Sequence, residues 1–559
     1  MITENFNKKV WLLIMVSSLI RLFFSFNVEL GNDEVYYWTF SHHLAWNYFD
    51  HPPLIAFLIR FFTANLTLES MEGFVRLGSL VCCGLSTYFI YKTTQYIHSS
   101  RAGFYAGLIY TGSVYASVIS GIMVMPDSPQ MVFWTSSLWV LSKIFSGKDS
   151  YKNWLLFGLL TGLCIMSKAH GIFLWFGLGI YIILKKREIL VSGKLYLAIA
   201  FSFILASPIL FWNIQNQFIT YRYHSQRVII QGSSINFLTF FRELLGQFLY
   251  NNPILVIFTL VALFNFKKIQ IKSLSKIPLV LFNFIGIPMA VLILGISLFR
   301  ETLPHWTGPA YVSLIPLTAI YFTQIPISSS NFSKKYNFGI PVGILASLIS
   351  LFLFLLLAYS IINFYPGTLN SGPEFSQLGF LKPTVIHSSK KNAKSKETSN
   401  LGEDDISLDL FGWRKAGLDF GNVISPITHK PLINRNFPLV IQKWFPGGHL
   451  DYYFCRPIGM SILGLGELNN LHQYYWYNFD WLNRNLNKTP DTAYTVIPSN
   501  LPLNIREEYK FYYTNFTHIM TISSSRGSII SENKIARNFE VYKMSGWKGR
   551  VPFIEAKNN

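Results

Sequence analysis

Two short polar motifs near the start of the chain have the residue types that acid–base chemistry at a membrane surface needs. Asn32-Asp33-Glu34 follows the first apolar stretch, and Asp50-His51-Pro52-Pro53 precedes the next one. A carboxylate at such a boundary can act as general base on an acceptor hydroxyl or amine. Asp33 and Glu34 are therefore the candidate catalytic residues. The alternative is that they are solvated loop residues or cap the following helix.

The two prolines after His51 favour a defined chain direction. Proline is well suited to the first turn of a helix, so Pro52 and Pro53 can hold Asp50 and His51 at the entry to an apolar helix. The simpler interpretation is a plain helix N-terminus with Asp50 near its cap.

Several cations later in the chain are candidates for holding a phosphate. Lys168 lies between two short apolar stretches and can bind a phosphate as a point charge, or it can extend to the membrane surface. Arginines can grip phosphate oxygens, but in outer loops they often contact lipid headgroups instead. The candidates are Arg222, Arg227 and Arg300. Asp127, between Pro126 and Pro129, is either a site residue or part of a turn.

Scattered histidines raise the question of a metal. His51, His170 and His305 could meet a metal together with Asp50 or Glu34, but no short-range ligand spacing supports such a site. We assign no metal ligand and name no certain cofactor, which leaves a divalent metal as an open question.

The elements that must position these residues are membrane helices. Of the 559 residues, 51% are hydrophobic and only 13% are charged, against about 25% charged in ordinary soluble domains. This composition excludes a disordered chain, a coiled coil and a typical soluble enzyme. It predicts a mainly α, polytopic helix bundle with about eleven spans. They lie near 10–26, 74–91, 102–122, 129–146, 153–167, 169–184, 195–213, 244–266, 277–299, 306–325 and 337–364.

The charges between these spans predict an orientation. With a cytoplasmic N-terminus, the cytoplasmic loops hold 17 basic and three acidic residues, and the outer loops and helix ends hold seven basic and nine acidic ones. This asymmetry follows the positive-inside rule. It explains much of the formal charge of +19 without a nucleic-acid partner. All the polar motifs above then fall on the extracytoplasmic side.

The same reasoning predicts three regions. Residues 1–364 form the transmembrane domain, with a long first outer loop at 27–73. Residues 365–406 form a flexible linker, and residues 407–559 form an extracytoplasmic α/β domain. Strands are expected at 438–441, 516–522 and 538–544.

These motifs together resemble the GT-C glycosyltransferases, and within them the dolichyl-phosphate-mannose–protein mannosyltransferase superfamily, which includes the ArnT-like aminoarabinose transferases of bacteria. The resemblance rests on the following stretches: Asn32 to Trp38, Asp50 to Leu54, Pro126 to Pro129, Leu163 to Lys168, His305 to Tyr311, Gly412-Trp413 and His472 to Trp476. His51-Pro52-Pro53 is similar to the mannosyltransferase pattern. Aminoarabinose transferases tend to carry Glu-Lys-Pro there and Arg at the position of Tyr36, which argues against that sugar.

The resemblance implies a donor sugar carried on a polyprenyl phosphate and a reaction in the bacterial inner membrane, facing away from the cytoplasm. The acceptor is a lipid, a glycan or a protein, and a single displacement would invert the anomeric centre. Asp33 corresponds to the acidic loop residue of the family. We assign substrate binding to Tyr36, Tyr37, Asp50, His51, Asp127 and His305.

Two other classes of function fit parts of the sequence. A lipid-linked saccharide flippase or transporter would also be polytopic and basic inside, although such proteins often have repeated halves around a midplane site. A non-catalytic scaffold built on the same fold would have lost its base, whereas Asp33 and Glu34 are present.

Overall fold

The computed structural model describes residues 5–229, 235–271, 273–324, 340–369, 405–424, 433–477, 491–525 and 535–549. It divides into two compact units. The first comprises Met1–Phe26 and Phe40–Leu355, and the second comprises Asn27–Thr39 and Leu356–Asn559. Residues 27–39, expected as part of the first outer loop, thus group with the C-terminal residues. Most of the predicted linker 365–406 lies outside the described residues.

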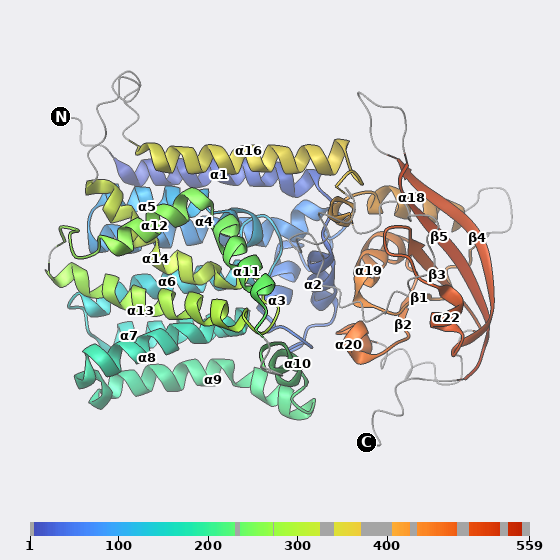
Figure 1. Ribbon diagram of the computed structural model, residues 1–559. Coiled ribbons are helices and arrows are strands. Elements are labelled where there is room, and N and C mark those ends of the chain that lie inside the picture. Colours follow the sequence, from blue (N-terminus) through green and yellow to red (C-terminus); the bar gives the residue numbers. More distant parts are fainter. Residues whose placement is uncertain are drawn as a thin grey trace. The chain divides into compact units, whose positions relative to one another are not determined.

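The described residues between 6 and 364 are mainly helical (Figure 1). The helices are α1 (Phe6–Asn27), α2 (Asn32–His42), α3 (Leu54–Phe62), α4 (Glu72–Ile97), α5 (Ser100–Gly112), α6 (Asp127–Phe145), α7 (Tyr151–Ser167), α8 (Ile172–Lys185), α9 (Gly193–Gln215), α10 (Ile219–Val228), α11 (Phe237–Tyr250), α12 (Pro253–Phe264), α13 (Ser273–Ile296), α14 (Gly308–Gln324) and α16 (Val342–Phe364). Helix α4 packs against α5 and α6, α6 against α7, α7 against α9, and α13 against α8 and α14.

The apolar character of these helices makes the protein a multi-pass membrane protein. Among the described residues, five helices are long and apolar enough to cross a membrane, or up to six if the bent pair α11 and α12 is one span. The five are α1, α4, α9, α16 and residues 276–296 of α13. The other expected spans correspond to shorter helices, so the number of about eleven spans stays a prediction.

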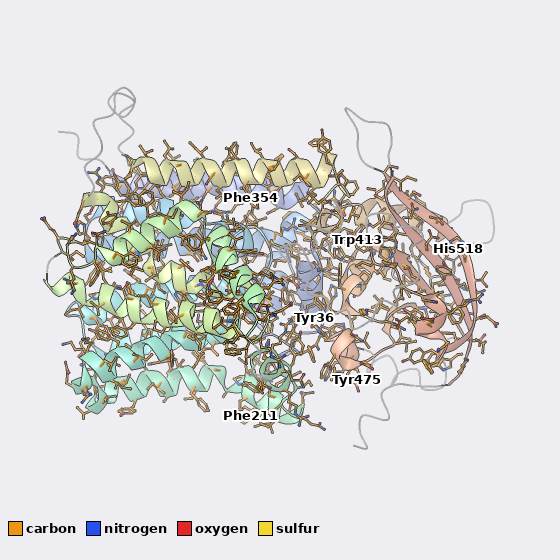
Figure 2. The ribbon with its side chains drawn as sticks, viewed as in Figure 1. Tyr36, Phe211, Phe354, Trp413, Tyr475 and His518 are labelled. Carbon is orange, nitrogen blue, oxygen red and sulfur yellow. The ribbon has the colours of Figure 1, made fainter. Side chains whose placement is uncertain are left out.

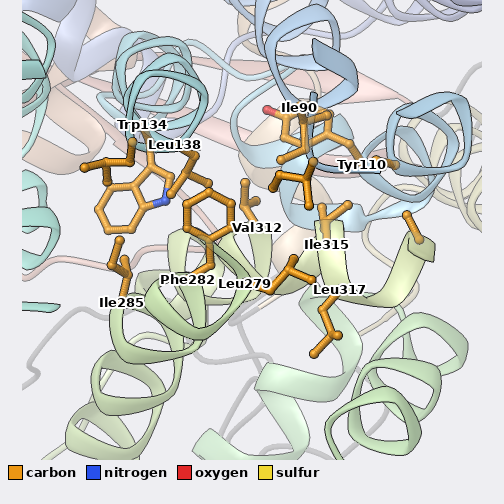
Figure 3. Packing of buried hydrophobic residues seen from close by; sticks show 14 of the residues in the cluster. Ile90, Tyr110, Trp134, Leu138, Leu279, Phe282, Ile285, Val312, Ile315 and Leu317 are labelled. Carbon is orange, nitrogen blue, oxygen red and sulfur yellow. The ribbon is translucent and has the colours of Figure 1, made fainter. Parts of the chain in front are cut away.

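The first unit has an apolar interior and an apolar exterior. Trp134 and Leu138 of α6 pack with Phe282 of α13 and Val312 of α14 in one buried cluster (Figure 3). Outward-facing positions are also apolar: Phe211 on α9 is 62% exposed (Figure 2). A helix that is apolar all round belongs in lipid, because water would penalise its exposed face.

The expected span at 244–266 contains a sharp break. Helices α11 and α12 meet at a bend of 97°. Asn252 has a positive φ of 68°, and its side chain donates to the carbonyl oxygens of Gly112 at 2.9 Å and of Ser347 at 3.0 Å. Pro253 begins α12 and disfavours a helical residue before it. These local and long-range bonds together stabilise the break.

The expected span at 102–122 is also interrupted. Helix α5 ends at Gly112, and a π-helix occupies Tyr115–Ile119. The buried guanidinium of Arg21 in α1 donates to the Ser117 hydroxyl at 2.8 Å, which stabilises this irregular turn. The turn presents Tyr115 toward the polar residues described below, as π-helical turns often do at functional sites.

The described part of the second unit contains a five-stranded mixed sheet. Its strands are β1 (Leu439–Ile441), β2 (Ile462–Gly464), β3 (Thr492–Pro498), β4 (Tyr513–Ser525) and β5 (Ile535–Trp547), in the order β2-β1-β3-β5-β4. β1 pairs in parallel with β2 and β3, whereas β5 pairs antiparallel with β3 and β4. Strands occur at the three places where the sequence pattern indicates them. That this unit is extracytoplasmic stays a prediction.

Helices accompany the sheet in the second unit. They are the 3₁₀ helix Ile406–Leu410, α18 (Trp413–Ile424), α19 (Trp444–His449), the π-helix Leu450–Cys455, the 3₁₀ helix Arg456–Ile458, α20 (Leu468–Leu471) and α22 (Ile505–Tyr509). Val440 of β1 and Met544 of β5 pack with Tyr509 of α22 in a small core.

Candidate active site

The acidic motif forms the first turn of α2, where its two carboxylates have different environments. Glu34 is fully buried, and its Oε2 accepts the backbone N–H of Gly31 at 2.9 Å. A glutamate at this helix position that reaches back to the preceding N–H is half of a capping box. Asp33 is only partly buried. Glu34 therefore caps the helix, as the alternative interpretation expected, and Asp33 is the carboxylate more open to a substrate.

C-terminal side chains bind the backbone just before this turn. The N–H of Leu30 donates to the Tyr453 hydroxyl at 2.7 Å, and the Leu30 carbonyl lies 2.9 Å from Nε2 of His449. Both polar groups of a buried residue are thus paired, which fixes the chain direction into α2. Burial lowers the pKa of His449 to about 3, so this imidazole is neutral and donates its Nε2 hydrogen to the carbonyl.

A third carboxyl group, Asp409, lies at the same turn. Its Oδ1 accepts the N–H of Asn32 at 3.2 Å. About a quarter of the Asp409 side chain, 27%, is accessible to solvent. Desolvation by the surrounding protein nevertheless raises the pKa of Asp409 to about 8. The hydrogen bond from Asn32 lowers this pKa, whereas the negative charges of Asp33 and Glu34 raise it. Sequence reasoning missed Asp409, because nothing local distinguishes it from any other aspartate.

A fourth acidic residue ties the segment to α18. Glu29 accepts the N–H of Trp413 at 2.8 Å and that of Arg414 at 3.3 Å. These are the first two residues of α18, and a carboxylate stabilises a helix at its N-terminus. The Trp413 ring stacks on His449 at 4.2 Å between ring centroids. The Gly412-Trp413 motif thus has a structural explanation: it supports the histidine that holds Leu30.

The tyrosines of the acidic motif are packed inside the second unit. Tyr36 is 1% exposed, its hydroxyl accepts the N–H of Gln473 at 3.3 Å, and its ring lies 5.0 Å from that of Trp444 (Figure 2). Tyr37 is also buried. Their assignment to substrate binding stays a prediction, and the contacts shown are structural.

A buried ion pair is the centre of the polar residues in the first unit. Nζ of Lys168 lies 2.7 Å from Oδ2 of Asp127, and the Tyr115 hydroxyl donates to Oδ1 of Asp127 at 2.8 Å. Asp127 begins α6, and Lys168 follows the last residue of α7 in an extended conformation. Both side chains are more than nine-tenths buried. The sequence marked both residues as candidates but did not indicate that they pair.

Histidines from separate segments face this ion pair. His51, His170 and His305 each interact electrostatically with both Lys168 and Asp127. Burial lowers the pKa of His51, and it lowers the pKa of His305 to about 4. These two imidazoles are therefore neutral near pH 7 and can accept or donate hydrogen bonds without adding charge.

The loop before α3 contacts helix α10. The Asp50 carbonyl accepts a hydrogen bond from Nε2 of His224 at 2.7 Å, and the His224 ring lies 6.2 Å from that of His51. The Asp50 side chain is 9% exposed. His51 and His224 both lie within electrostatic range of Lys168.

The predicted arginines differ in their surroundings. Arg227 interacts electrostatically with His51 and His305, and it stacks on the Tyr223 ring at 4.9 Å. Arg222 is exposed on the same helix, α10. Nε of Arg300 donates to the Ile229 carbonyl at 2.8 Å. Of the three predicted arginines, Arg227 is therefore the one that interacts with the histidines around Lys168.

The described residues do not gather the ligands of a metal. Within them, no group of three or more His, Cys, Asp or Glu side chains is arranged to hold a metal ion. The neutral histidines instead lie beside a lysine, which would repel a cation. The acidic segment belongs to the second unit and the Lys168 cluster to the first, and the expected proximity of Asp33 to Lys168 stays a prediction.

Comparison with known proteins places this cluster in a family context. Residues 50–212 match the family model described as dolichyl-phosphate-mannose-protein mannosyltransferase. The matched region contains Asp50, His51, Asp127 and Lys168. Over 285 residues the chain is 22% identical to the lipid A galacturonosyltransferase RgtD of Rhizobium johnstonii, covering 50% of this chain and 58% of that relative. The chain thus spans little more than half the length of this relative.

Solved structures share the fold. The crystal structure of ArnT from Cupriavidus metallidurans bound to undecaprenyl phosphate superposes with a TM-score of 0.55 at 13% identity, covering 95% of this chain and 97% of that chain. The apo state of the same protein has a TM-score of 0.55 at 12% identity, covering 96% and 98%. At such identities the likeness shows a common fold.

Proposed function

We propose that this chain is a GT-C glycosyltransferase, which transfers one sugar from a polyprenyl-phosphate donor to a lipid, glycan or protein acceptor. The observation that carries this proposal is that the family match over residues 50–212 includes the buried Asp127–Lys168 pair and the loop with His51. That cluster has the charge and the hydrogen-bond donors that a sugar phosphate needs.

The donor phosphate would bind at Lys168. An ammonium group has three hydrogen-bond donors, and one of them contacts Asp127. The remaining two can reach phosphate oxygens, and Arg227 adds a second cation. Neutral His51 and His305 can hydrogen-bond the sugar or the phosphate. Fixed cations beside a departing phosphate stabilise the charge that develops as the glycosidic bond breaks.

Asp33 would activate the acceptor. The bond from the anomeric carbon to the phosphate oxygen breaks, and a bond from that carbon to the acceptor oxygen or nitrogen forms. The acceptor proton passes to the Asp33 carboxylate, and the polyprenyl phosphate leaves with the electron pair. One displacement of this kind inverts the anomeric centre.

The place of the reaction follows from the charge distribution. We place the N-terminus in the cytoplasm and the candidate residues at the extracytoplasmic face of a bacterial inner membrane, because basic residues concentrate in the opposite loops. Asp33 and Lys168 each lie at a helix end, and on this placement each would be near the surface at which a lipid-borne sugar phosphate meets water.

Mass spectrometry of envelope glycolipids and glycoproteins tests the proposal, in cells with the wild-type protein, with Asp33→Asn, and without the protein. We expect one sugar to disappear from one class of molecule in the deletion strain. With Asp33→Asn the product should fall by about 10²–10⁴-fold, the range for a positioned acid–base group. Asp33→Asn that is folded and fully active would contradict the role of Asp33. If cells without the protein instead accumulate a lipid-linked saccharide on one leaflet and no sugar transfer depends on the protein, a flippase would be favoured.

A further inference from the structure

A cavity lies at the other end of the helices that carry Asp127 and Lys168. It has a volume of about 480 Å³ and opens at the turn between α6 and α7. Asp127 begins α6 and Lys168 follows α7, so the cavity is separated from the candidate active site by the length of both helices. Lys143, Lys148 and Lys152 line it, together with Trp139 and Leu156. The proposed function gives these residues no role.

The lysines of this cavity repel one another. Lys143 interacts unfavourably with Lys148, Lys152 and the neighbouring Lys92. Nζ of Lys143 lies 3.0 Å from the centre of the Trp139 ring, which holds its charge at the cavity wall. Several positive charges around one cavity stabilise a bound anion, because the anion offsets the repulsion between them.

The one aspartate of the cavity has partners of its own. Asp149 lies 2.8 Å from Nζ of Lys194, and its Oδ1 accepts the indole N–H of Trp154 at 2.7 Å. The charge of Asp149 therefore offsets the charge of Lys194. The three lysines that line the cavity leave it with a net positive charge. The N-terminus of the 17-residue helix α7 adds to this field, since Ser150 and Asn153 of its first turn also line the cavity.

We propose that this cavity binds the phosphate group of an anionic phospholipid. Lys143, Lys148 and Lys152 would contact the phosphate, and Trp139 and Leu156 would contact the apolar part of the lipid. The apolar wall and the position at the end of α6 and α7, which are both expected as membrane spans, favour a lipid over a soluble phosphate. Basic cavities between helices at the cytoplasmic side recognise acidic headgroups in this way.

Native mass spectrometry of the full-length protein, released from detergent with added dioleoyl phosphatidylglycerol, dioleoyl phosphatidylcholine or inorganic phosphate, tests the proposal. We expect retention of phosphatidylglycerol over phosphatidylcholine. The triple variant Lys143→Gln/Lys148→Gln/Lys152→Gln should weaken phosphatidylglycerol binding by about tenfold or more. The matched control Lys185→Gln/Lys186→Gln/Arg187→Gln removes the same charge at the end of α8 and should leave binding unchanged.

Each outcome bears on the site. Equal loss in the two triple variants, or equal retention of the two lipids, would overturn the proposal. Displacement of the lipid by millimolar inorganic phosphate would show an anion site that is not selective for lipids, and would overturn the lipid part. Hydrogen exchange on the wild-type protein needs no variant: phosphatidylglycerol, and not phosphatidylcholine, should slow exchange at 146–153, and no slowing would count against the site.

Discussion

The hydroxyl of Tyr453 accepts the backbone N–H of Leu30 at 2.7 Å, across 423 positions of the chain. Leu30 is the second residue before Asn32, where helix α2 and its acidic motif begin. The same residue is held at its carbonyl by His449. The acidic motif is therefore positioned by side chains from the C-terminal part of the chain, and this relationship leads to the first two predictions.

Tyr453→Phe should loosen the acidic motif. The change removes the acceptor of the Leu30 N–H, which is buried, and an unpaired buried donor costs about 1–3 kcal/mol. Hydrogen exchange of residues 28–39 should become faster, and product formation should fall. Tyr542→Phe on β5 removes a hydroxyl elsewhere in the same unit and should leave exchange at 28–39 unchanged. Unaltered exchange in Tyr453→Phe would show that the bond has no positioning role.

Asp409 should make stability fall as the pH rises. Its pKa is about 8 in the folded protein against an ordinary value of 3.8, so the folded state binds more protons than the unfolded state between these values. Stability then decreases from about pH 4 to pH 8 on account of this group. Asp409→Asn does not titrate, and Asn can still accept the Asn32 N–H, so this slope should disappear.

The apparent unfolding midpoint, followed by tryptophan fluorescence of the detergent-solubilised protein at pH 5 and pH 8, measures this slope. The wild type should lose more stability between the two pH values than Asp409→Asn does. Asp419→Asn on α18 is the control and should behave as the wild type. Asp409→Ala also removes the acceptor of Asn32 and should be about 1 kcal/mol less stable than Asp409→Asn at either pH. The same slope in Asp409→Asn and wild type would rule out Asp409 as its source.

Glu34→Gln and Asp33→Asn should have different effects. Glu34 accepts the Gly31 N–H, and glutamine keeps an acceptor oxygen there, so Glu34→Gln should retain activity within about tenfold. Asp33→Asn should lose about 10²–10⁴-fold. Both variants are measured by the amount of glycosylated product relative to protein in the membrane. An activity loss in Glu34→Gln as large as in Asp33→Asn would assign the base to Glu34.

Lys168→Met should destabilise the protein, because it leaves Asp127 buried without its cation. Removing one partner of such a pair costs about 3–5 kcal/mol, whereas replacing both partners by neutral groups is often tolerated. The double variant Asp127→Asn/Lys168→Met should therefore recover most of the melting temperature. It should nevertheless stay inactive if Lys168 binds the donor phosphate. Recovery of activity together with stability would make the pair purely structural.

Asn252→Ala should destabilise the bend between α11 and α12. The variant loses the hydrogen bonds to Gly112 and Ser347, each worth about 1 kcal/mol, and places alanine at a positive φ. Asn252→Gly loses the same bonds but adopts this φ freely, so it should melt at a higher temperature than Asn252→Ala. Equal melting temperatures for the wild type and both variants would mean that the asparagine does not hold the bend.

Composition and local pattern were enough to assign this protein to the polytopic membrane proteins. In lipid, the backbone N–H and C=O groups of a long apolar stretch must pair within the chain, which favours a helix. The long apolar helices expected on this ground are α1, α4, α9, α13 and α16. The motifs around His51 and Lys168 also indicated a resemblance to the mannosyltransferases, and both lie within the residues 50–212 that match that family model. The strand at 538–544 followed from the alternation of its side chains.

Only the tertiary structure decided which residues meet. The pairing of Lys168 with Asp127, the capping role of Glu34 and the contact of Asp409 with Asn32 depend on distances between segments that no local pattern contains. The same is true of the break at Asn252, whose side chain bonds to carbonyls of two distant helices. Hydrophobic periodicity indicates which face of a segment is buried, but the partner of a buried polar group is set by the packing of the whole unit.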